Sequence, residues 1–254
     1  MIKILRSVCE IIIIIFFKLF NYPLNIPIKK YNFSKNGVNI FVKTNNSLTY
    51  RRWKNFERTG KETETLNWID TFENNSVFYD IGAHIGIFSI YGAIKKKLKV
   101  CSFEPEPNNF IELYNTIKAN KLDIIPIMLP LYSNKKNLVL NMSSFGTGHS
   151  AHILKSEKLK QDYLISTTDT IDSLIQSKFI EIPNYIKIDT HGNEKEILLG
   201  MEETLRSNIV KSILVELDFI EDLNFVKNYL KKYNFNLTND NSDGNWNFIF
   251  KKES

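Results

Sequence analysis

Short apolar runs alternate with longer stretches of helical periodicity along most of this chain. From residue 76 onward, the runs predict strands and the periodic stretches predict helices. This alternation is typical of an α/β protein, with a parallel sheet and helices on both faces. The predicted strands are 76–80, 98–103, 122–129, 184–189 and 211–217, and the predicted helices are 86–96, 107–120, 171–178, 193–206 and 221–232.

Two later segments have a different pattern. Residues 130–170 are irregular, with at least one further short strand at 137–141. The tail predicts strands at 233–238 and 246–250, joined across a polar turn. Asp243 and Gly244 in that turn are a hairpin signal, so we expect an antiparallel pair at the end of the sheet.

The N-terminal segment is strongly apolar from Ile4 to Phe20. Its uninterrupted part, Ile11–Phe17, is shorter than the ~20 residues that a spanning helix needs. No small-residue cleavage site follows, which argues against a cleaved signal peptide. Residues 1–30 therefore predict an apolar helix that packs on the domain, forms a homodimer contact or lies on a membrane surface through residues 4–20, and a true span also stays open.

The rest of the chain divides into two further parts. Residues 31–60 predict an accessory β and linker segment, because Val38–Lys43 alternates and a polar turn follows it. A helix over 59–72 then leads into the first strand, and residues 61–254 form the main domain. With 254 residues, of which 43% are hydrophobic, the chain can bury a full core.

Charge and cysteine content exclude some classes of function. The net charge is +5, and the 33 basic and 28 acidic residues are spread evenly, which argues against a nucleic-acid partner. Cys9 and Cys101 have no partner spacing, so they indicate a reducing compartment and no zinc knuckle. We expect a cytoplasmic protein, with peripheral contact at the inner face of the membrane as the open alternative.

The most informative stretch is residues 77–92, where an apolar strand ends in Asp80 and a glycine turn leads into a helix. Such a unit seats nucleotide-like cofactors in α/β sheets. A dinucleotide site needs G-x-G-x-x-G, but here His84 occupies the second glycine position and the acid precedes the loop. A carboxylate repels phosphate and suits a cationic ligand. The pattern D-x-G-x-x-x-G thus favours S-adenosylmethionine, with its ammonium and sulfonium, over NAD.

A second acid supports this cofactor. Glu104 stands at the end of the next predicted strand, followed by Pro105, where a carboxylate can accept hydrogen bonds from both ribose hydroxyls. We therefore expect six residues to bind the cofactor: Asp80, Gly82, Ala83, Gly86, Glu104 and Pro105.

Five motifs occur in order, namely YDIGAHIGIFS, SFEPEPNNF, TIDSL, YIKIDTHGNEKEILLGMEETL and ILVEL. Together they resemble the FkbM family of S-adenosylmethionine-dependent O-methyltransferases over about residues 60–235. The resemblance implies a class I methyltransferase fold, Rossmann-like, with a seven-stranded, mainly parallel sheet. It also implies methylation of a hydroxyl on a carbohydrate or glycan precursor, as in surface polysaccharide biosynthesis. Asp172, Glu194 and Glu216 match further acids of its motifs.

Asp189 matches the K-I-D-x-x-G-x-E motif of the family, and Lys187 precedes it by two residues. His191 departs from the pattern, because relatives more often carry an acid there. Since an alcohol must lose a proton when it is methylated, we expect His191 to act as the base and Asp189 to orient it or the acceptor. Asp189 could also cap the helix that starts near Asn193, with Glu194 better explained as support for that cap in the first turn, and Asp172 is better explained as a helix cap or first-turn acid.

Further substrate contacts are expected from Lys187, Glu216, and His149 and His152 of the loop 143–152. These two histidines could form a metal site with His191 and Asp189, although their spacing does not require one. Arg51 and Arg52 suit either an anion contact or a solvated surface pair. Alternative functions remain open: O-methylation of another small metabolite or lipid, a nicotinamide-dependent dehydrogenase, and a non-catalytic adaptor that binds a membrane or partner.

Overall fold

A computed structural model describes residues 29–60, 62–142, 152–239 and 246–253. The expected N-terminal helix, His149 and the turn at Asp243 and Gly244 lie outside the described residues. Within them, no helix combines the length and the apolar character that crossing a membrane requires.

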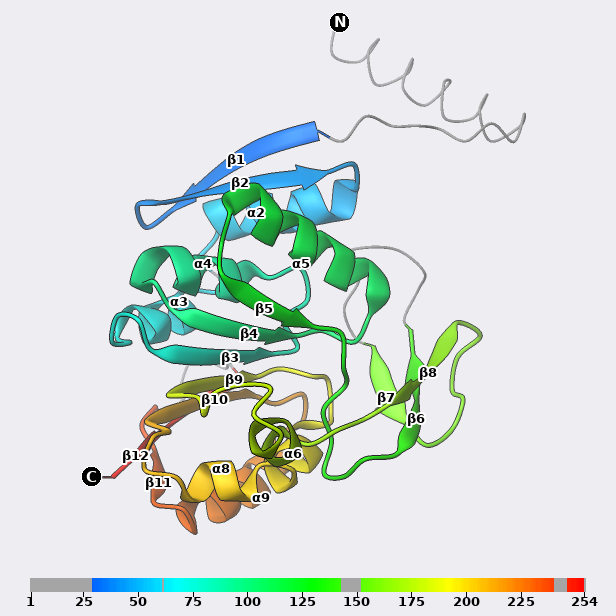
Figure 1. The fold of residues 1–254 in the computed structure, drawn as a ribbon, viewed down its shortest axis with the longest axis vertical. Coiled ribbons are helices and arrows are strands. Elements are labelled where there is room, and N and C mark those ends of the chain that lie inside the picture. The colour runs from blue at the N-terminus through cyan, green and yellow to red at the C-terminus, as the bar shows by residue number, and fades with distance from the viewer. Residues whose placement is uncertain (1–28, 61, 143–151, 240–245, 254) are drawn as a thin grey trace, which may run out of the picture.

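A seven-stranded sheet forms the centre of the molecule (Figure 1). Every pairing is parallel except those of β12, which runs antiparallel to both neighbours. The mainly parallel sheet with a C-terminal antiparallel strand pair is therefore confirmed. In order across the sheet, the strands are β11 (Phe235–Leu237), β12 (Asn247–Lys252), β10 (Ser212–Glu216), β9 (Tyr185–Ile188), β3 (Val77–Ile81), β4 (Lys99–Phe103) and β5 (Ile124–Ile127).

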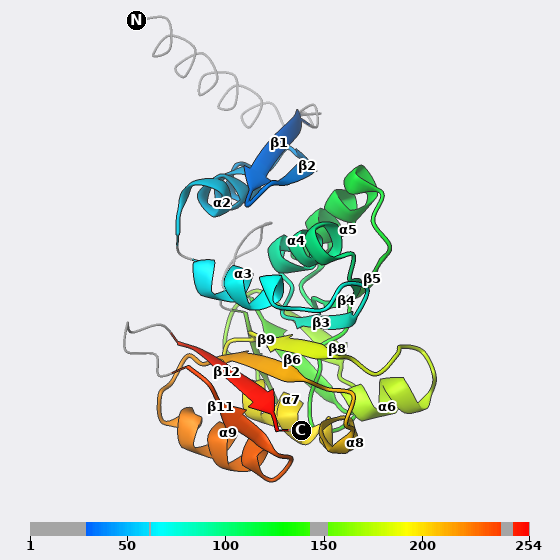
Figure 2. The same ribbon diagram turned by 90° about the vertical axis from the view of Figure 1, so that its left-hand side faces the viewer.

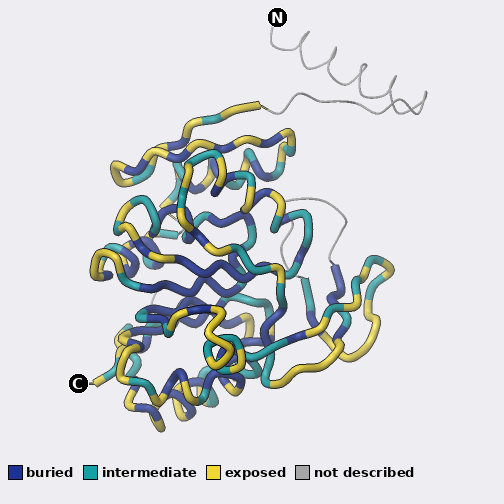
Figure 3. Tube along the Cα trace, viewed as in Figure 1, coloured by how far each residue is buried: buried dark blue, intermediate teal, exposed yellow. Residues whose placement is uncertain are grey.

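Helices cover both faces of this sheet (Figure 2). Because side chains alternate along a strand, Phe78 packs on one side and Tyr79 on the other. The side of Phe78 is covered by α3 (Thr63–Asp70), α4 (Ile87–Lys96) and α5 (Pro107–Asn120). The side of Tyr79 is covered by α6 (Ile171–Gln176), α7 (Glu194–Leu199), α8 (Glu202–Arg206) and α9 (Asp222–Lys231). The strands between these layers are almost wholly buried (Figure 3).

An N-terminal unit forms an outer layer over α4 and α5. It consists of the hairpin β1 (Lys29–Lys35) and β2 (Val38–Thr44), followed by α2 (Ser47–Arg58). The side chain of Asn46 caps α2 by accepting hydrogen bonds from the backbone N–H groups of Leu48 and Thr49. Sequence reasoning expected a linker here and missed α2, since its only strong apolar anchors are Trp53 and Phe56.

The irregular stretch 130–170 folds as a small antiparallel sheet, with β6 (Asn137–Asn141) between β7 (Ile153–Lys155) and β8 (Tyr163–Thr167). It lies beyond the carboxyl ends of the central strands (Figure 1). A backbone hydrogen bond of 3.0 Å from Tyr132 N to Asp169 O brings its two ends together.

One predicted helix, 193–206, is broken into α7 and α8. The break falls at Gly200, where an added Cβ would lie 2.2 Å from the carbonyl oxygen of Tyr132. The helical segment and the chain that leads into the small sheet therefore approach more closely here than any side chain allows.

Candidate active site

A cavity of about 280 Å³ opens at the carboxyl ends of β3, β4, β9 and β10. This is the edge at which parallel α/β sheets bind ligands, beside the point between β3 and β9 where the strand order reverses. The expected residues Gly82, Ala83, Glu104, Pro105, His152, Lys187, Asp189, His191 and Glu216 all line it. Sequence reasoning did not single out the polar lining residues Glu62, Asn109, Thr190 and Asn193, nor the apolar side chains that complete the cavity wall.

Gly82 begins the loop after β3 and adopts a positive φ of 79°. A Cβ at this position would lie 1.8 Å from the carbonyl oxygen of Asp189, so only glycine lets the ends of β3 and β9 meet. The N–H groups of Gly82 and Ala83 both donate to the carbonyl of Phe103, at 3.0 and 2.9 Å. These donors point toward β4 and not toward a ligand, so this part of the loop makes no phosphate cradle.

Glu104 lies at the tip of β4 and is only 5% exposed. Its Oε2 accepts a hydrogen bond from His84 N at 2.7 Å, and its Oε1 accepts one from Glu106 N at 2.8 Å. Burial raises the pKa of Glu104 to about 8, although both backbone bonds oppose the rise. Each carboxylate oxygen keeps a further lone pair that can accept a ligand hydroxyl.

Asp80 and Gly86 are placed differently from the other expected cofactor residues, because neither lines the cavity. The Oδ2 of Asp80 accepts hydrogen bonds from the backbone N and the Oγ of Ser89, while its Oδ1 has no partner among the described residues. Gly86 lies against Leu113. Asp80 thus supports the start of α4 from behind the cavity wall.

A buried lysine joins the tips of β3, β9 and β10. Lys187 is 1% exposed and stands opposite Asp80 in the register of β3 and β9. Its Nζ donates to Asp189 Oδ2 at 2.8 Å and lies 5.0 Å from the centre of the Phe88 ring. Although burial favours the neutral acid, this ammonium outweighs it and holds the pKa of Asp189 below its usual range.

Glu216 completes this group at the end of β10. Burial and then the charge of Asp189 raise the pKa of Glu216 to about 8, despite the opposing effect of Lys187. The pKa values of two neighbouring carboxyls are therefore shifted in opposite directions, that of Asp189 downward and that of Glu216 upward. Carboxyls with perturbed pKa values in a cavity are typical of functional sites.

His191 lies on the loop between β9 and α7, with a positive φ of 54°. Its Nδ1 lies 3.3 Å from both carboxylate oxygens of Asp218, a residue that sequence reasoning did not single out. The loop is held by Glu194, whose carboxylate accepts hydrogen bonds from the backbone N–H groups of Thr190 and Gly192. Glu194 therefore has a structural role: its carboxylate fixes the loop on which His191 lies.

Asp172 also acts as a cap, as expected, but on a different helix. Its carboxylate accepts hydrogen bonds from the backbone N–H groups of Glu203 and Thr204 at the start of α8. No cluster of three or more metal-ligating side chains occurs within the described ranges.

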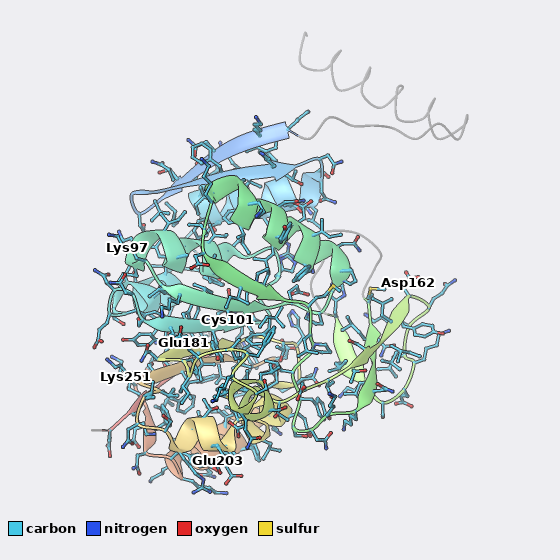
Figure 4. The ribbon with its side chains drawn as sticks, viewed as in Figure 1. Lys97, Cys101, Asp162, Glu181, Glu203 and Lys251 are labelled. Atoms are coloured by element: carbon cyan, nitrogen blue, oxygen red, sulfur yellow. The ribbon has the colours of Figure 1, made fainter. Side chains whose placement is uncertain are left out.

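A second cavity, of about 820 Å³, lies at the opposite end of the sheet, near the amino ends of β3 and β4. Cys101 and Glu181 both contribute to it (Figure 4). Burial raises the pKa of the Cys101 thiol to about 12, so it is not a nucleophile. The candidate active site is therefore the cavity at the carboxyl ends of the strands, which His191, Asp189 and Glu104 line.

Comparison with known proteins points to one family. The model of the methyltransferase FkbM domain matches residues 80–237. A curated relative, the hexuronic acid methyltransferase AglP of Haloferax volcanii, is 26% identical over 165 residues. That alignment spans 65% of this chain and 65% of the relative's length.

Two solved structures illustrate the structural likeness. TYW2 of M. jannaschii, solved in complex with AdoMet, has 15% identity and a TM-score of 0.44, covering 89% of this chain and 88% of that one. A putative rRNA-methylase from Clostridium thermocellum has 11% identity and a TM-score of 0.48, covering 77% of this chain and 97% of that one.

Proposed function

Because this chain belongs to the FkbM methyltransferase family, whose methyl donor is S-adenosylmethionine, we propose that it methylates a hydroxyl group of a carbohydrate or glycan precursor. One observation carries the proposal: His191 and Asp189 share a single cavity with Glu104 and the Gly82 loop. The hexuronic acid specificity in the name of the relative AglP supports a sugar acceptor. We assign the catalytic domain to residues 61–254.

The lining residues of the cavity suit the chemistry of the cofactor. Glu104 at the tip of β4 suits the ribose hydroxyls, and the apolar side chains of Ile87, Phe103 and Leu131 line the same cavity and suit the adenine ring. The carboxylates of Asp189 and Glu62 suit a ligand with positive charge. When bound, S-adenosylmethionine supplies an electrophilic methyl group on a sulfonium.

His191 receives the proton of the acceptor hydroxyl in this mechanism. Asp218 holds Nδ1, which orients the ring and stabilises the imidazolium that forms. Asp189, kept ionised by Lys187, accepts a hydrogen bond from the acceptor and aligns it. Positioning supplies much of the rate, since correct alignment of two reactants lowers the barrier by several kcal/mol.

Transfer of a labelled methyl group to glycosides and uronides tests the proposal. We expect His191→Ala to lower kcat about 10²–10⁴-fold, because a general base contributes that much, and to leave the affinity for S-adenosylhomocysteine unchanged. The kcat of Asp218→Asn should lie between that of the parent and that of His191→Ala. Near-parental turnover by His191→Ala across the pH range would remove His191 as the base.

The bond that forms is checked on the labelled product. Methylation of a hydroxyl gives an ether that survives mild alkali, whereas methylation of a uronic carboxylate gives an ester that alkali hydrolyses. Release of the label by alkali would contradict the hydroxyl acceptor. Binding of S-adenosylhomocysteine with no transfer to any sugar would instead favour another metabolite or lipid as the acceptor.

A further inference from the structure

Two charged side chains from the N-terminal part of the chain line the cavity, Arg52 of α2 and Glu62 just before α3. Both precede residue 80, where the match to the family model begins. This part of the cavity wall is therefore built by a segment that the family model does not include.

Arg52 is held on a rigid element. The next residue in α2, Trp53, is fully buried and lies with its ring centre 6.1 Å from that of Phe33 in β1. Asn46 caps the same helix. A side chain that comes from a packed and capped helix holds its position better than one from a loop.

Arg52 lines the same cavity as Asp189 and Glu216. Its charge interacts with those of Glu62 and Asp189, and Glu62 in turn acts on Glu216. Arg52 is half-buried, so its guanidinium is partly removed from water, whereas the neighbouring Arg51 is exposed and does not line the cavity. A partly desolvated guanidinium binds an anion more strongly than an exposed one does.

We propose that Arg52 binds an anionic group, a carboxylate or a phosphate, on the acceptor sugar. The planar guanidinium matches either anion with two parallel hydrogen bonds. Glu62 acts against this contact, because its carboxylate competes for the same cation. The inference rests on the proposed sugar acceptor and narrows it to acidic sugars.

Binding of small sugars to the full chain loaded with S-adenosylhomocysteine tests the inference without requiring turnover. The probes are methyl glucuronide, glucose 1-phosphate and methyl glucoside, followed by ligand-observed NMR titration. The variants are Arg52→Gln, Glu62→Gln and, as the matched control, Arg51→Gln from the same helix.

We expect Arg52→Gln to weaken the binding of a charged probe at least about tenfold, with little change for methyl glucoside. Glu62→Gln should bind the same charged probe more tightly, and Arg51→Gln should bind all three probes with the affinity of the parent. Whether glucuronide or phosphate responds identifies the anion.

Equal losses in Arg51→Gln and Arg52→Gln would overturn the inference, as would a parent that binds all three probes equally or binds neither charged probe. The proposed function fails separately. A parent that binds glucuronide through Arg52 but transfers no methyl group would refute sugar methylation and keep the anion site.

Discussion

Replacing Lys187 by methionine removes the positive charge that three carboxyls share. The ammonium is 1% exposed and bonds Asp189 at 2.8 Å, and it also acts on Asp80 and Glu216. Breaking a buried ion pair by removing one partner costs about 3–5 kcal/mol. Because the Asp189 side chain is 24% exposed, water can partly solvate the remaining carboxylate, and we expect the lower figure, about 3 kcal/mol.

The pH dependence follows from the direction of the shifts. Lys187 holds the pKa of Asp189 below its ordinary value, so this stabilisation is present above about pH 4 and is lost as the pH falls further. The difference in unfolding free energy between parent and Lys187→Met should therefore shrink in acid. Asp80 does not add to this acid-dependent stabilisation, because burial raises its pKa instead of lowering it.

Denaturant unfolding of the parent, Lys187→Met, Asp189→Asn and the double variant measures the effect. The double-mutant cycle should give a coupling free energy of about 2 kcal/mol, so that the double variant loses less than the sum of the single ones. Additive losses, or a loss below about 1 kcal/mol for Lys187→Met, would refute the ion pair as the stabilising contact.

Three further predictions concern the cofactor loop and the catalytic loop. Burial raises the pKa of Glu104 to about 8, and its ionised form accepts hydrogen bonds from ribose hydroxyls better, so calorimetry should show that the affinity for S-adenosylhomocysteine rises from pH 7 to 9. Glu104→Gln should bind S-adenosylhomocysteine more weakly and show no such rise. A parallel rise in parent and variant would contradict this prediction. Gly82→Ala should abolish that binding and lower the melting temperature, because its Cβ collides with the Asp189 carbonyl. Gly37→Ala, at a similar φ of 77° with nothing within 4 Å, should cost only about 1–2 kcal/mol and keep binding; identical behaviour of the two alanine variants would show that φ alone matters. Glu194→Gln should lower kcat without changing cofactor affinity, because it loosens the loop of His191, and an unchanged kcat would show that this loop holds itself.

The strand and helix order and the charged residues at the strand ends could be predicted from the sequence, because they depend on local patterns. The ends of strands carry Glu104, Asp189 and His191 to one edge of a parallel sheet whatever the details of packing. Asp80 shows the limit of this reasoning. It lies two residues after Phe78 in β3, on the face that packs against α4, and so its side chain points under the helix and not into the cavity.

Other parts of the site depend on tertiary contacts that carry no local signal. Arg52 reaches the cavity only because Trp53 anchors α2 against the β1–β2 hairpin. Lys187 did leave a signal, since a lysine inside the apolar strand Tyr185–Ile188 must meet buried carboxylates, but the sequence alone did not say which ones. Asp189 is two residues away in the chain, but Asp80 of β3 and Glu216 of β10 come near Lys187 only through the order of the strands in the sheet.

The small sheet of β6, β7 and β8 leaves the core and returns to it at one point. Leu131 and Asp169 form a parallel bridge, and Tyr132 N donates to Asp169 O. Leu140, His152 and Leu154 of this excursion line the cavity, whereas the Gly82 loop and Glu104 belong to the central sheet. The cavity wall is thus shared between the central sheet and this insertion, so that exchanging the insertion between relatives would reshape one side of the cavity and leave Glu104 and the Gly82 loop in place.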